Sequence, residues 1–339
     1  MKHCVVTGGA GFIGSHLVEA LLARGDRVSV VDDESTGTVA NLAAVLGHPR
    51  LDYTKGTMAD EELVRTLVAD ADEVYHLAAA VGVQLIAQSP IHTIETNIYT
   101  TELLFRQLGR LVAAGRSVKC FMTSTSEVYG KNPKPRWTEE DDLLFGPTTR
   151  PRWSYGASKA IDEFLALAYW RERKLPVVVG RLFNVVGPRQ TGAYGMVLPR
   201  LIDAALAGRP LSVHDDGRQQ RCFAHVSDVV RMILALMACP AAVGGVVNIG
   251  SDQPVSILDL ARQVIAVVDP SLEVEFISYV QAYGEDFEDC RRRVPDLTKL
   301  RTLTGLQARY GLDDIIRELV AWKRKMAADT TETRRTRKD

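Results

Sequence analysis

Tyr155 and Lys159 are the pair of residues in this chain most suited to chemistry. Both stand at the start of a helical pattern, and Lys159 follows Tyr155 by about one helical turn, so the two share one helix face. The positive charge of a lysine ammonium favours the phenolate form of a nearby tyrosine and lowers the pKa of its hydroxyl. A tyrosine activated in this way can take a proton from the hydroxyl of a substrate.

A second polar stretch precedes this helix and follows the apolar run at residues 120–122, which indicates the end of a buried strand. It contains Thr125, Ser126 and Glu127, which offer two hydroxyls and a carboxylate. A carboxylate in a cleft can act as a general acid or base. The alternative is that Glu127 only accepts a hydrogen bond from a backbone N–H and that the hydroxyls are ordinary strand-end groups.

Three glycines near the N-terminus, Gly8, Gly11 and Gly14, stand between a short apolar strand at residues 4–6 and an amphipathic helix that stops at Gly25. Glycines in this pattern permit a tight turn, a close approach of the backbone to a pyrophosphate and close packing of helix on strand. The free N–H groups at the start of the helix then bind phosphate. The pattern predicts a dinucleotide-binding βαβ unit.

Asp32 ends the next strand, residues 28–31, and completes this unit. A carboxylate there accepts hydrogen bonds from the adenosine ribose and repels the extra phosphate of NADP, which predicts NAD as the cofactor. The alternative is a solvated turn acid. A further strand at 73–80 runs into small residues, against which a cofactor can lie. We expect His76, within that strand, to be structural.

The rest of the chain continues with helices and strands, which predicts an α/β fold. A long helix is expected at 91–114, where a stripe that includes Ile94 and Ile98 indicates a core or dimer face. Residues 246–250 are expected to return to the main sheet, and the polar tail at 327–339 to be disordered. Other helices are expected at 197–207, 229–237, 256–267 and 312–325, and short strands at 176–180, 211–214 and 221–226.

The composition is that of an ordinary globular protein, because 46% of the 339 residues are hydrophobic and 24% are charged. The formal net charge of -1 gives no reason to expect nucleic acid or an anionic membrane as a partner. The five cysteines are scattered without a Cys-x-x-Cys pair, which indicates reduced thiols and neither a disulfide framework nor a metal site. We expect no signal peptide and no membrane span, and hence a cytoplasmic enzyme.

Five motifs occur in order along the chain: Thr7–Gly14, Asp32 with Ser35-Thr36-Gly37, His76-Leu77-Ala78-Ala79, Tyr155-x-x-x-Lys159, and Arg181-x-x-Asn184-x-x-Gly187-Pro188-Arg189. Through these motifs the chain resembles the extended short-chain dehydrogenase/reductases, a family of nucleotide-sugar epimerases, dehydratases and decarboxylases. The resemblance covers nearly the whole chain, to about residue 325. It implies a Rossmann domain, a doubly wound parallel sheet that holds NAD, with a smaller C-terminal α/β domain for a nucleoside diphosphate sugar.

The resemblance also implies where these domains lie along the chain. The Rossmann domain would comprise residues 1–183 and about 219–250. The smaller domain would comprise about 184–218 and 251–326.

A second copy of the chain is an implied partner. The family forms homodimers through a four-helix bundle, here built from the helices near 91–114 and 155–172 of each chain. The other implied partner is the substrate, a UDP-sugar.

The resemblance assigns three groups of residues to the site. The implied catalytic residues are Tyr155, Lys159, Thr125, Glu127, Ser126 and Arg293. The implied NAD-binding residues are Gly8, Gly11, Phe12, Ile13, Gly14, Asp32, Ser35, Thr36, Gly37, Leu77, Ala78 and Ala79, together with Tyr155 and Lys159. The implied substrate-binding residues are Asn184, Arg189, Arg221, Arg291, Arg292 and Tyr283. Because residues 291–293 are all arginines, the sequence leaves open which of them lies in the site, and the run could instead be solvated.

The triplet Thr125-Ser126-Glu127 is similar to that of the UDP-glucuronate decarboxylases, although GDP-mannose 4,6-dehydratases also carry Ser-Glu here. The similarity implies oxidation of UDP-glucuronate at C4, loss of CO2 from the resulting β-keto acid, and re-reduction to UDP-xylose or release of the 4-keto-pentose. A UDP-glucuronate or UDP-hexose 4-epimerase and an NDP-hexose 4,6-dehydratase are the alternatives. A non-catalytic, NAD-sensing scaffold would be expected to lack Tyr155 or Lys159.

Overall fold

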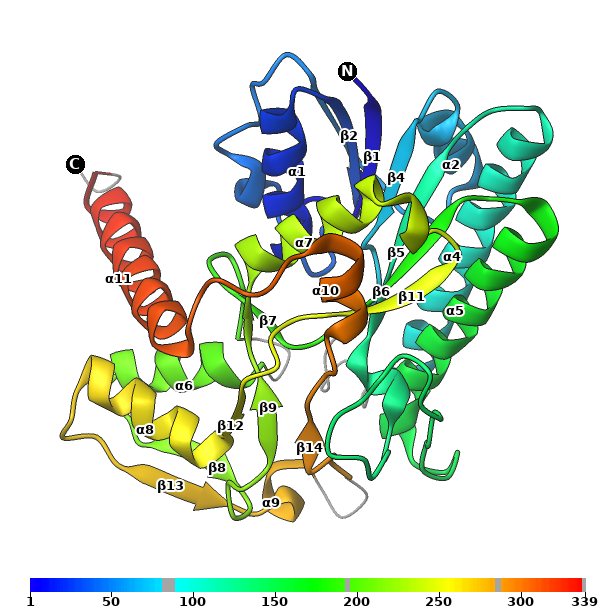
Figure 1. Cartoon of the computed structure of the whole chain (residues 1–339). Coiled ribbons are helices and arrows are strands. Elements are labelled where there is room, and N and C mark those ends of the chain that lie inside the picture. The colour runs from blue at the N-terminus through cyan, green and yellow to red at the C-terminus, as the bar shows by residue number, and fades with distance from the viewer. Residues whose placement is uncertain (81–88, 193–195, 284–287, 337–339) are drawn as a thin grey trace.

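A parallel sheet of seven strands forms the centre of the computed structural model, which describes residues 1–80, 89–192, 196–283 and 288–336 (Figure 1). Its strand order is β11-β6-β5-β4-β1-β2-β3, and every pairing within it is parallel. The sequence-based prediction of a doubly wound α/β fold is confirmed. The strands are β1 (His3–Thr7), β2 (Arg27–Asp32), β3 (Leu51–Lys55), β4 (Glu73–His76), β5 (Lys119–Thr125), β6 (Val177–Leu182) and β11 (Gly245–Ile249).

Helices cover both faces of this sheet (Figure 1). Successive strand residues point to opposite faces, so Val6 packs into the cluster with α1 and α7, and Val5 into the cluster with α2, α4 and α5. Strands covered on both faces are apolar throughout, which is why they appear in the sequence as continuous apolar runs. The helices are α1 (Phe12–Arg24) and α7 (Val226–Ala238) on one face, and α2 (Glu61–Val68), α4 (Pro90–Ala113) and α5 (Ser154–Arg173) on the other.

The two edges of the sheet differ in how well the sequence predicts them. β11 pairs with β6 from Gly245 to Ile249, as expected for the return to the main sheet. At the other edge, β3 and α2 were not predicted. In β3 only Leu51 and Tyr53 are partly buried, whereas Asp52, Thr54 and Lys55 are exposed, so this strand gives no continuous apolar run.

The smaller part of the chain has an apolar core of its own, formed by α6, α8 and α11 (Figure 1). Residues 221–226, expected as one strand, form two: β9 pairs with β12 and β14, whereas β10 pairs with β7. The single strand expected at 221–226 is therefore wrong, and neither of the two strands pairs with the seven-stranded sheet. These elements are β7 (Val185–Val186), α6 (Val197–Leu206), β8 (Leu211–His214), β9 (Gln220–Cys222), β10 (Ala224–His225), β12 (Pro254–Ser256), α8 (Ile257–Val268), β13 (Val274–Ile277), α9 (Tyr279–Tyr283), β14 (Arg292–Arg293) and α11 (Leu312–Thr336).

Two C-terminal helices differ from the prediction. α10 (Thr298–Thr304) packs against α7 and β11, and its Leu300 lies in the core of the Rossmann part, although the sequence placed this segment in the smaller domain. α11 continues to Thr336, so most of the tail expected to be disordered is helical. No glycine or proline follows Gly311 to end the helix, and its alanines, lysines and arginines favour helix.

The first half of α4 buries polar residues and exposes apolar ones. Thr93, Asn97 and Thr101 face the interior, whereas Ile91 and Ile94 are 72% and 39% exposed. Of the stripe that begins at Ile94, the core interpretation is therefore wrong for Ile94 and confirmed for Leu104 and Phe105, which are fully buried in the core. No helix in the described residues is long and apolar enough to span a membrane.

Candidate active site

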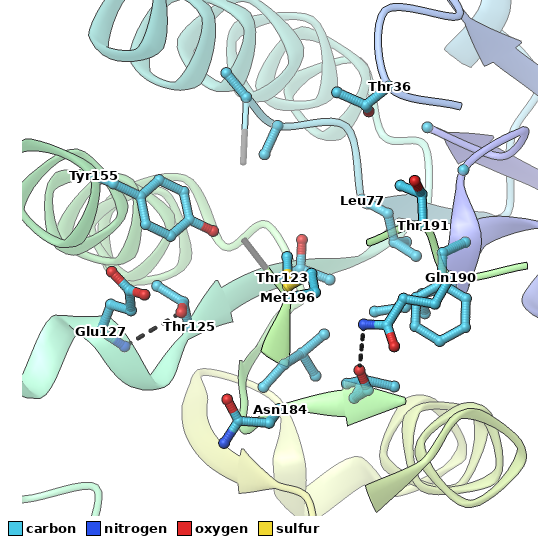
Figure 2. A pocket seen from close by; sticks show the side chains of 18 of the residues that line it. Thr36, Leu77, Thr123, Thr125, Glu127, Tyr155, Asn184, Gln190, Thr191 and Met196 are labelled. Atoms are coloured by element: carbon cyan, nitrogen blue, oxygen red, sulfur yellow. Dashed lines mark hydrogen bonds between the residues drawn. The ribbon is translucent and has the colours of Figure 1, made fainter. Parts of the chain in front are cut away.

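A cavity of about 560 Å³ crosses the carboxyl ends of the central strands and continues into the smaller part of the chain. Open α/β sheets bind ligands at this edge, where the loops after the strands leave a crevice. Figure 2 shows Tyr155, Thr125 and Glu127 on one side of the cavity and Thr36, Leu77 and Gln190 on the other, with the Tyr155 hydroxyl pointing inward.

The glycine loop after β1 forms a cradle that has no room for side chains. Gly8 has a φ of 69°, and a Cβ placed on it would lie 2.8 Å from the backbone nitrogen of Ala78. A Cβ on Gly14 would lie 2.1 Å from the carbonyl oxygen of Gly8. No side chain caps α1, and its first turn carries no acid. The start of α1 can therefore receive the pyrophosphate of a dinucleotide on its backbone N–H groups.

Asp32 lies at the end of β2, where its carboxylate is fixed by the backbone. Its Oδ2 accepts a hydrogen bond from the Ala10 N–H at 2.9 Å, and its Oδ1 accepts one from the Glu34 N–H at 2.8 Å. Each carboxylate oxygen keeps a second lone pair, so both can still accept hydrogen bonds from ribose hydroxyls. The carboxylate therefore fits NAD, as its position in the sequence predicts.

Most residues predicted to bind the cofactor line the cavity; only Gly37 does not. Gly37 instead packs against the Ala10 backbone, where a Cβ would lie 2.8 Å from the Ala10 carbonyl carbon. Asp33, Thr57 and Met58 also line this half of the cavity, although they were not predicted from the sequence. Thr57 and Met58 follow β3, so the unpredicted edge strand hid them.

Tyr155 and Thr125 lie together in the other half of the cavity. Burial and the Glu127 charge raise the pKa of Tyr155, while a hydrogen bond with Thr125 lowers it. The expectation that the Lys159 charge lowers the pKa of Tyr155 stays a prediction, because the hydrogen bond that lowers this pKa here comes from Thr125. Lys159 instead donates a hydrogen bond to Asp162, with 2.9 Å between Nζ and Oδ2.

Glu127 follows β5 in a single 3-10 turn and is held between two arginines. Its Oε1 lies 3.0 Å from Nη1 of Arg293, and its Oε2 accepts a hydrogen bond from Nη1 of Arg152. Burial alone would raise the pKa of Glu127, but the charges and hydrogen bonds of Arg152 and Arg293 lower it to about 2. Glu127 is therefore ionised at neutral pH, and the alternative in which it bonds only a backbone N–H is wrong.

The consecutive arginines have different positions. Arg293 is buried and lines the cavity, whereas Arg291 and Arg292 are exposed. Arg291 pairs with Asp216 outside the cavity, at 2.8 Å. Arg189 does not line the cavity either, because it pairs with Glu19 on α1. The predictions that Arg189, Arg291 and Arg292 contact the substrate are therefore not supported by their positions.

Arg221 and Asn184, both predicted to bind substrate, do line the cavity. Arg221 pairs with Asp289 at 2.8 Å, and Asn184 donates a hydrogen bond to the Cys222 carbonyl oxygen at 3.0 Å. The side chain of Tyr283 lies outside the described residues. Its helix instead supplies Tyr279, whose hydroxyl donates to Asp289 at 2.8 Å.

Three further residues that were not predicted line this half of the cavity: Arg152, Tyr279 and Asp289. Arg152 precedes Tyr155 by about one turn, so its helical spacing was a usable signal. The acidic and basic composition of residues 285–293 carries no periodicity that could have selected Asp289. No group of three or more His, Cys, Asp or Glu side chains among the described residues is placed to hold a metal ion.

A parallel sheet with a glycine loop after β1, an acid after β2 and a Tyr155–Lys159 pair beside the end of β5 defines an extended short-chain dehydrogenase/reductase. Comparison with known proteins narrows this class. The chain belongs to the GDP-mannose 4,6 dehydratase family, whose profile matches residues 5–319.

Curated relatives resemble the chain over most of its length. It is 37% identical over 329 residues to a UDP-N-acetyl-alpha-D-glucosaminuronate decarboxylase of Bacillus cytotoxicus, covering 97% of this chain and 99% of the relative. It is 33% identical over 324 residues to UDP-glucuronic acid decarboxylase 1 of Xenopus tropicalis, covering 96% of this chain and 72% of the relative.

Solved structures of other activities have the same fold. A UDP-glucuronic acid 4-epimerase from Bacillus cereus, in complex with UDP-glucuronic acid and NAD, has a TM-score of 0.85 at 28% identity, covering 96% of this chain and 99% of that one. A dTDP-glucose 4,6-dehydratase from Streptomyces venezuelae, with NAD bound, has a TM-score of 0.84 at 30% identity, covering 95% and 97%.

Proposed function

We propose that this protein is an NAD-dependent decarboxylase of UDP-linked uronic acids, with UDP-glucuronate as substrate. The observation that carries the proposal is the Glu127 carboxylate between Arg152 and Arg293, next to Tyr155. Two relatives that are 37% and 33% identical to the chain are named as decarboxylases of UDP-linked uronic acids, which supports the proposal. The relative from Bacillus cytotoxicus favours a second candidate substrate, UDP-N-acetylglucosaminuronate.

The charges around the sugar end of the cavity suit an anionic sugar. Arg152, Arg221 and Arg293 supply three positive charges, and Glu127 and Asp289 supply two negative ones. This balance leaves one positive charge in a partly buried site, where it favours a carboxylate over a neutral hydroxymethyl group. Nε of Arg152 is buried and has no hydrogen-bond partner among the described residues.

The glycine loop and Asp32 would hold NAD, which when bound would supply the acceptor for the hydride from C4 of the sugar and the means to return it. Tyr155, as phenolate, takes the proton of the C4 hydroxyl, and Thr125 hydrogen-bonds the same oxygen. Tyr155 must first lose its own proton. Because its pKa is raised in the structure without ligand, positive charge from the bound cofactor and from Lys159 is needed to lower that pKa.

The resulting 4-ketone is β to the C6 carboxylate, so the bond between C5 and C6 breaks and CO2 leaves. The electron pair of that bond moves to the C4 oxygen as an enolate, where the Tyr155 hydroxyl and Thr125 donate hydrogen bonds. A proton then adds to C5. Glu127, with a pKa of about 2, is ionised at neutral pH and has no proton to donate, so the proton comes from solvent and we assign Glu127 to orient Arg152 and Arg293.

A 4-epimerase or a 4,6-dehydratase would use the same oxidation. A dehydratase also needs a proton donor for the leaving C6 hydroxyl, and Ser126 beside Glu127 is a poor acid. A UDP-hexose 4-epimerase needs no group that handles a carboxylate, whereas a UDP-glucuronate 4-epimerase binds one and differs from a decarboxylase only in retaining it.

The test is to incubate the protein together with NAD and one sugar nucleotide at a time, and to follow CO2 release and product mass. The three substrates are UDP-glucuronate, UDP-N-acetylglucosaminuronate and UDP-glucose. We expect CO2 from a uronate and no product from UDP-glucose. Unchanged mass with inverted C4 would show epimerisation, and loss of water from the neutral sugar would show dehydration. Tyr155→Phe should abolish both NADH formation and CO2 release.

We also propose a homodimer through α4 and α5, which pack side by side on the outside of the sheet (Figure 1). Exposed apolar side chains gather on these helices. Ile91 and Phe164 are more than 70% exposed, and Tyr99 and Ile161 are each 49% exposed. A second copy of the same two helices would bury this face and complete a four-helix bundle.

A further inference from the structure

A buried carboxylate, Asp162, stands behind the Lys159 side chain. Its residue is 0% exposed, and Lys159 is 2% exposed. Oδ2 of Asp162 accepts a hydrogen bond from Nζ of Lys159 at 2.9 Å. Oδ1 of Asp162 forms no hydrogen bond of standard geometry among the described residues. The nearby Thr101 hydroxyl nevertheless favours the ionised form of Asp162. A fully buried carboxylate is costly unless a charge partner offsets it.

Lys159 is the cation that offsets this carboxylate. On the other side of Asp162, the Thr101 hydroxyl lies 3.2 Å from Nε2 of His76, whose Nδ1 lies 2.8 Å from the Thr7 hydroxyl. Burial and then the charge of Lys159 lower the pKa of His76 to about 3, so this imidazole is neutral at neutral pH. His76 therefore cannot balance Asp162.

We propose that Asp162 is a positioning residue that anchors Lys159 and shares its charge, thereby controlling how readily Tyr155 loses its proton. Tyr155, Lys159 and Asp162 follow one another at intervals of four and three residues, so they lie on one face of α5. The proposal rests on Tyr155 as the base of the proposed function and does not depend on which sugar is the substrate.

Asp162 is placed to act on Tyr155 as well as on Lys159. Burial makes the largest contribution to the raised pKa of Tyr155, Glu127 the next, and Asp162 also raises it. The positive charge of Lys159, meanwhile, is hydrogen-bonded to Asp162. Removing the Asp162 charge should therefore make Tyr155 more acidic, both directly and by leaving the Lys159 charge unshared.

Other charged groups around these residues are accounted for. Tyr155 also faces Glu127 from the turn after β5 and Arg152 from the turn before α5. Asp162 also faces Glu163 on its own helix, while α4 presents the neutral Thr101, and His76 of β4 lies behind Thr101. Glu163 is bound by Arg181 at 2.7 Å, so its charge is balanced by a different partner.

The test measures the ionisation of Tyr155 directly, in the NAD complex without sugar. Tyrosines carry a ¹³C label at Cζ, the Tyr155→Phe variant assigns the Tyr155 signal, and its chemical shift is followed with pH. In Asp162→Asn, which keeps the shape and an acceptor oxygen, we expect the titration midpoint of Tyr155 to fall by roughly one pH unit. Because no sugar is used, failure of the protein to decarboxylate leaves this result unaffected.

Glu163→Gln is the matched control, since it removes a neighbouring buried carboxylate that does not contact Lys159. It should lower the melting temperature without moving the Tyr155 midpoint. If Asp162→Asn does not fold, Thr101→Val should move the midpoint in the same direction, because it removes the hydroxyl that favours ionised Asp162. A midpoint that stays or rises in the folded variants, or that falls equally in Glu163→Gln, would overturn the proposal.

Discussion

The carboxylate of Glu127 joins two arginines that arrive in the cavity from different parts of the chain. Arg152 comes from the turn before α5 and Arg293 from β14. Because the charges of Glu127, Arg152 and Arg293 lie close together in a buried site, removing one side chain leaves charge on the others without an opposite charge to balance it. The electrostatics of the sugar end of the cavity therefore depend on all three side chains together.

Replacing Glu127 by Gln should separate the oxidation step from the carbon step. Tyr155 and Thr125 remain, so NADH should still form from a UDP-uronate. The two arginines lose their shared partner and are free to bind the substrate carboxylate in its ground state, so CO2 release should slow by about 100-fold or more. Single-turnover measurements of NADH absorbance and of CO2 check this, and equal loss of both would contradict the role given to Glu127.

Arg293 and Arg292 provide a matched pair of substitutions, because they are adjacent in sequence and differ in burial. Arg293→Ala should reduce kcat/KM for the UDP-uronate by at least about 100-fold, since it removes a charged partner inside the cavity. Arg292→Ala should leave kcat/KM within about twofold of the wild type. Steady-state kinetics on both variants decides this, and similar losses would show that the arginine run acts through its overall charge.

At the scale of elements, α5 has two separate tasks on its two sides. Its inner side carries Tyr155 and Lys159 at the cavity, and its outer side exposes Ile161 and Phe164. The first half of α4 is divided in a similar way, with threonines and Asn97 inside and Ile91 and Ile94 outside. A helix that is polar toward its own domain and apolar toward solvent suits contact with a second protein chain.

Phe164→Glu should therefore weaken the proposed dimer. Phe164 is 71% exposed, so the substitution costs the monomer little, whereas a glutamate opposite a second apolar face is strongly unfavourable. We expect a monomer by light scattering after size-exclusion chromatography. Phe276→Glu, at an exposed position on β13, is the control and should leave the assembly unchanged. A dimer that survives Phe164→Glu would rule out this interface.

At the scale of the whole molecule, the cavity is shared between the Rossmann part and the smaller part. The glycine loop, Asp32 and Tyr155 come from the former, and Arg221 and Asp289 from the latter. The ion pair between Glu127 and Arg293 crosses between them. Its protonation state therefore bears on the stability of the molecule as well as on the chemistry.

Stability should fall in acid through this cluster. Burial would raise the pKa of Glu127, but Arg152 and Arg293 lower it from 4.5 to about 2. A lowered folded-state pKa stabilises the folded chain above the ordinary pKa, and this stabilisation is lost as the pH falls toward the folded value. The shift corresponds to on the order of 3 kcal/mol.

Urea denaturation of the wild type and of Glu127→Gln at several pH values measures this contribution. The difference in free energy of unfolding should be largest near neutral pH and should shrink between about pH 4.5 and pH 2. A difference that does not change with pH would show that Glu127 stabilises the chain by packing alone.

Local spacing was enough to predict the cofactor half of the site. Gly8 and Gly11 lie in the turn between β1 and α1, Gly14 lies in the first turn of α1, and Asp32 ends the very next strand. Tyr155 and Lys159 share one helix face because their spacing matches the helical repeat. In each case the residues that act together are close in sequence, so short-range geometry determined their arrangement.

The sugar half was decided by the tertiary structure. Neighbouring residues of a strand point to opposite sides. The pairing of β14 with β9 aligns Arg293 with Arg221, and this register determines which arginine enters the cavity. The sequence alone could not supply that register. Similarly, Asp162 reads in the sequence as an ordinary polar helix residue. Packing of α4 over α5 removes water from around it, and that burial is what makes Lys159 its partner.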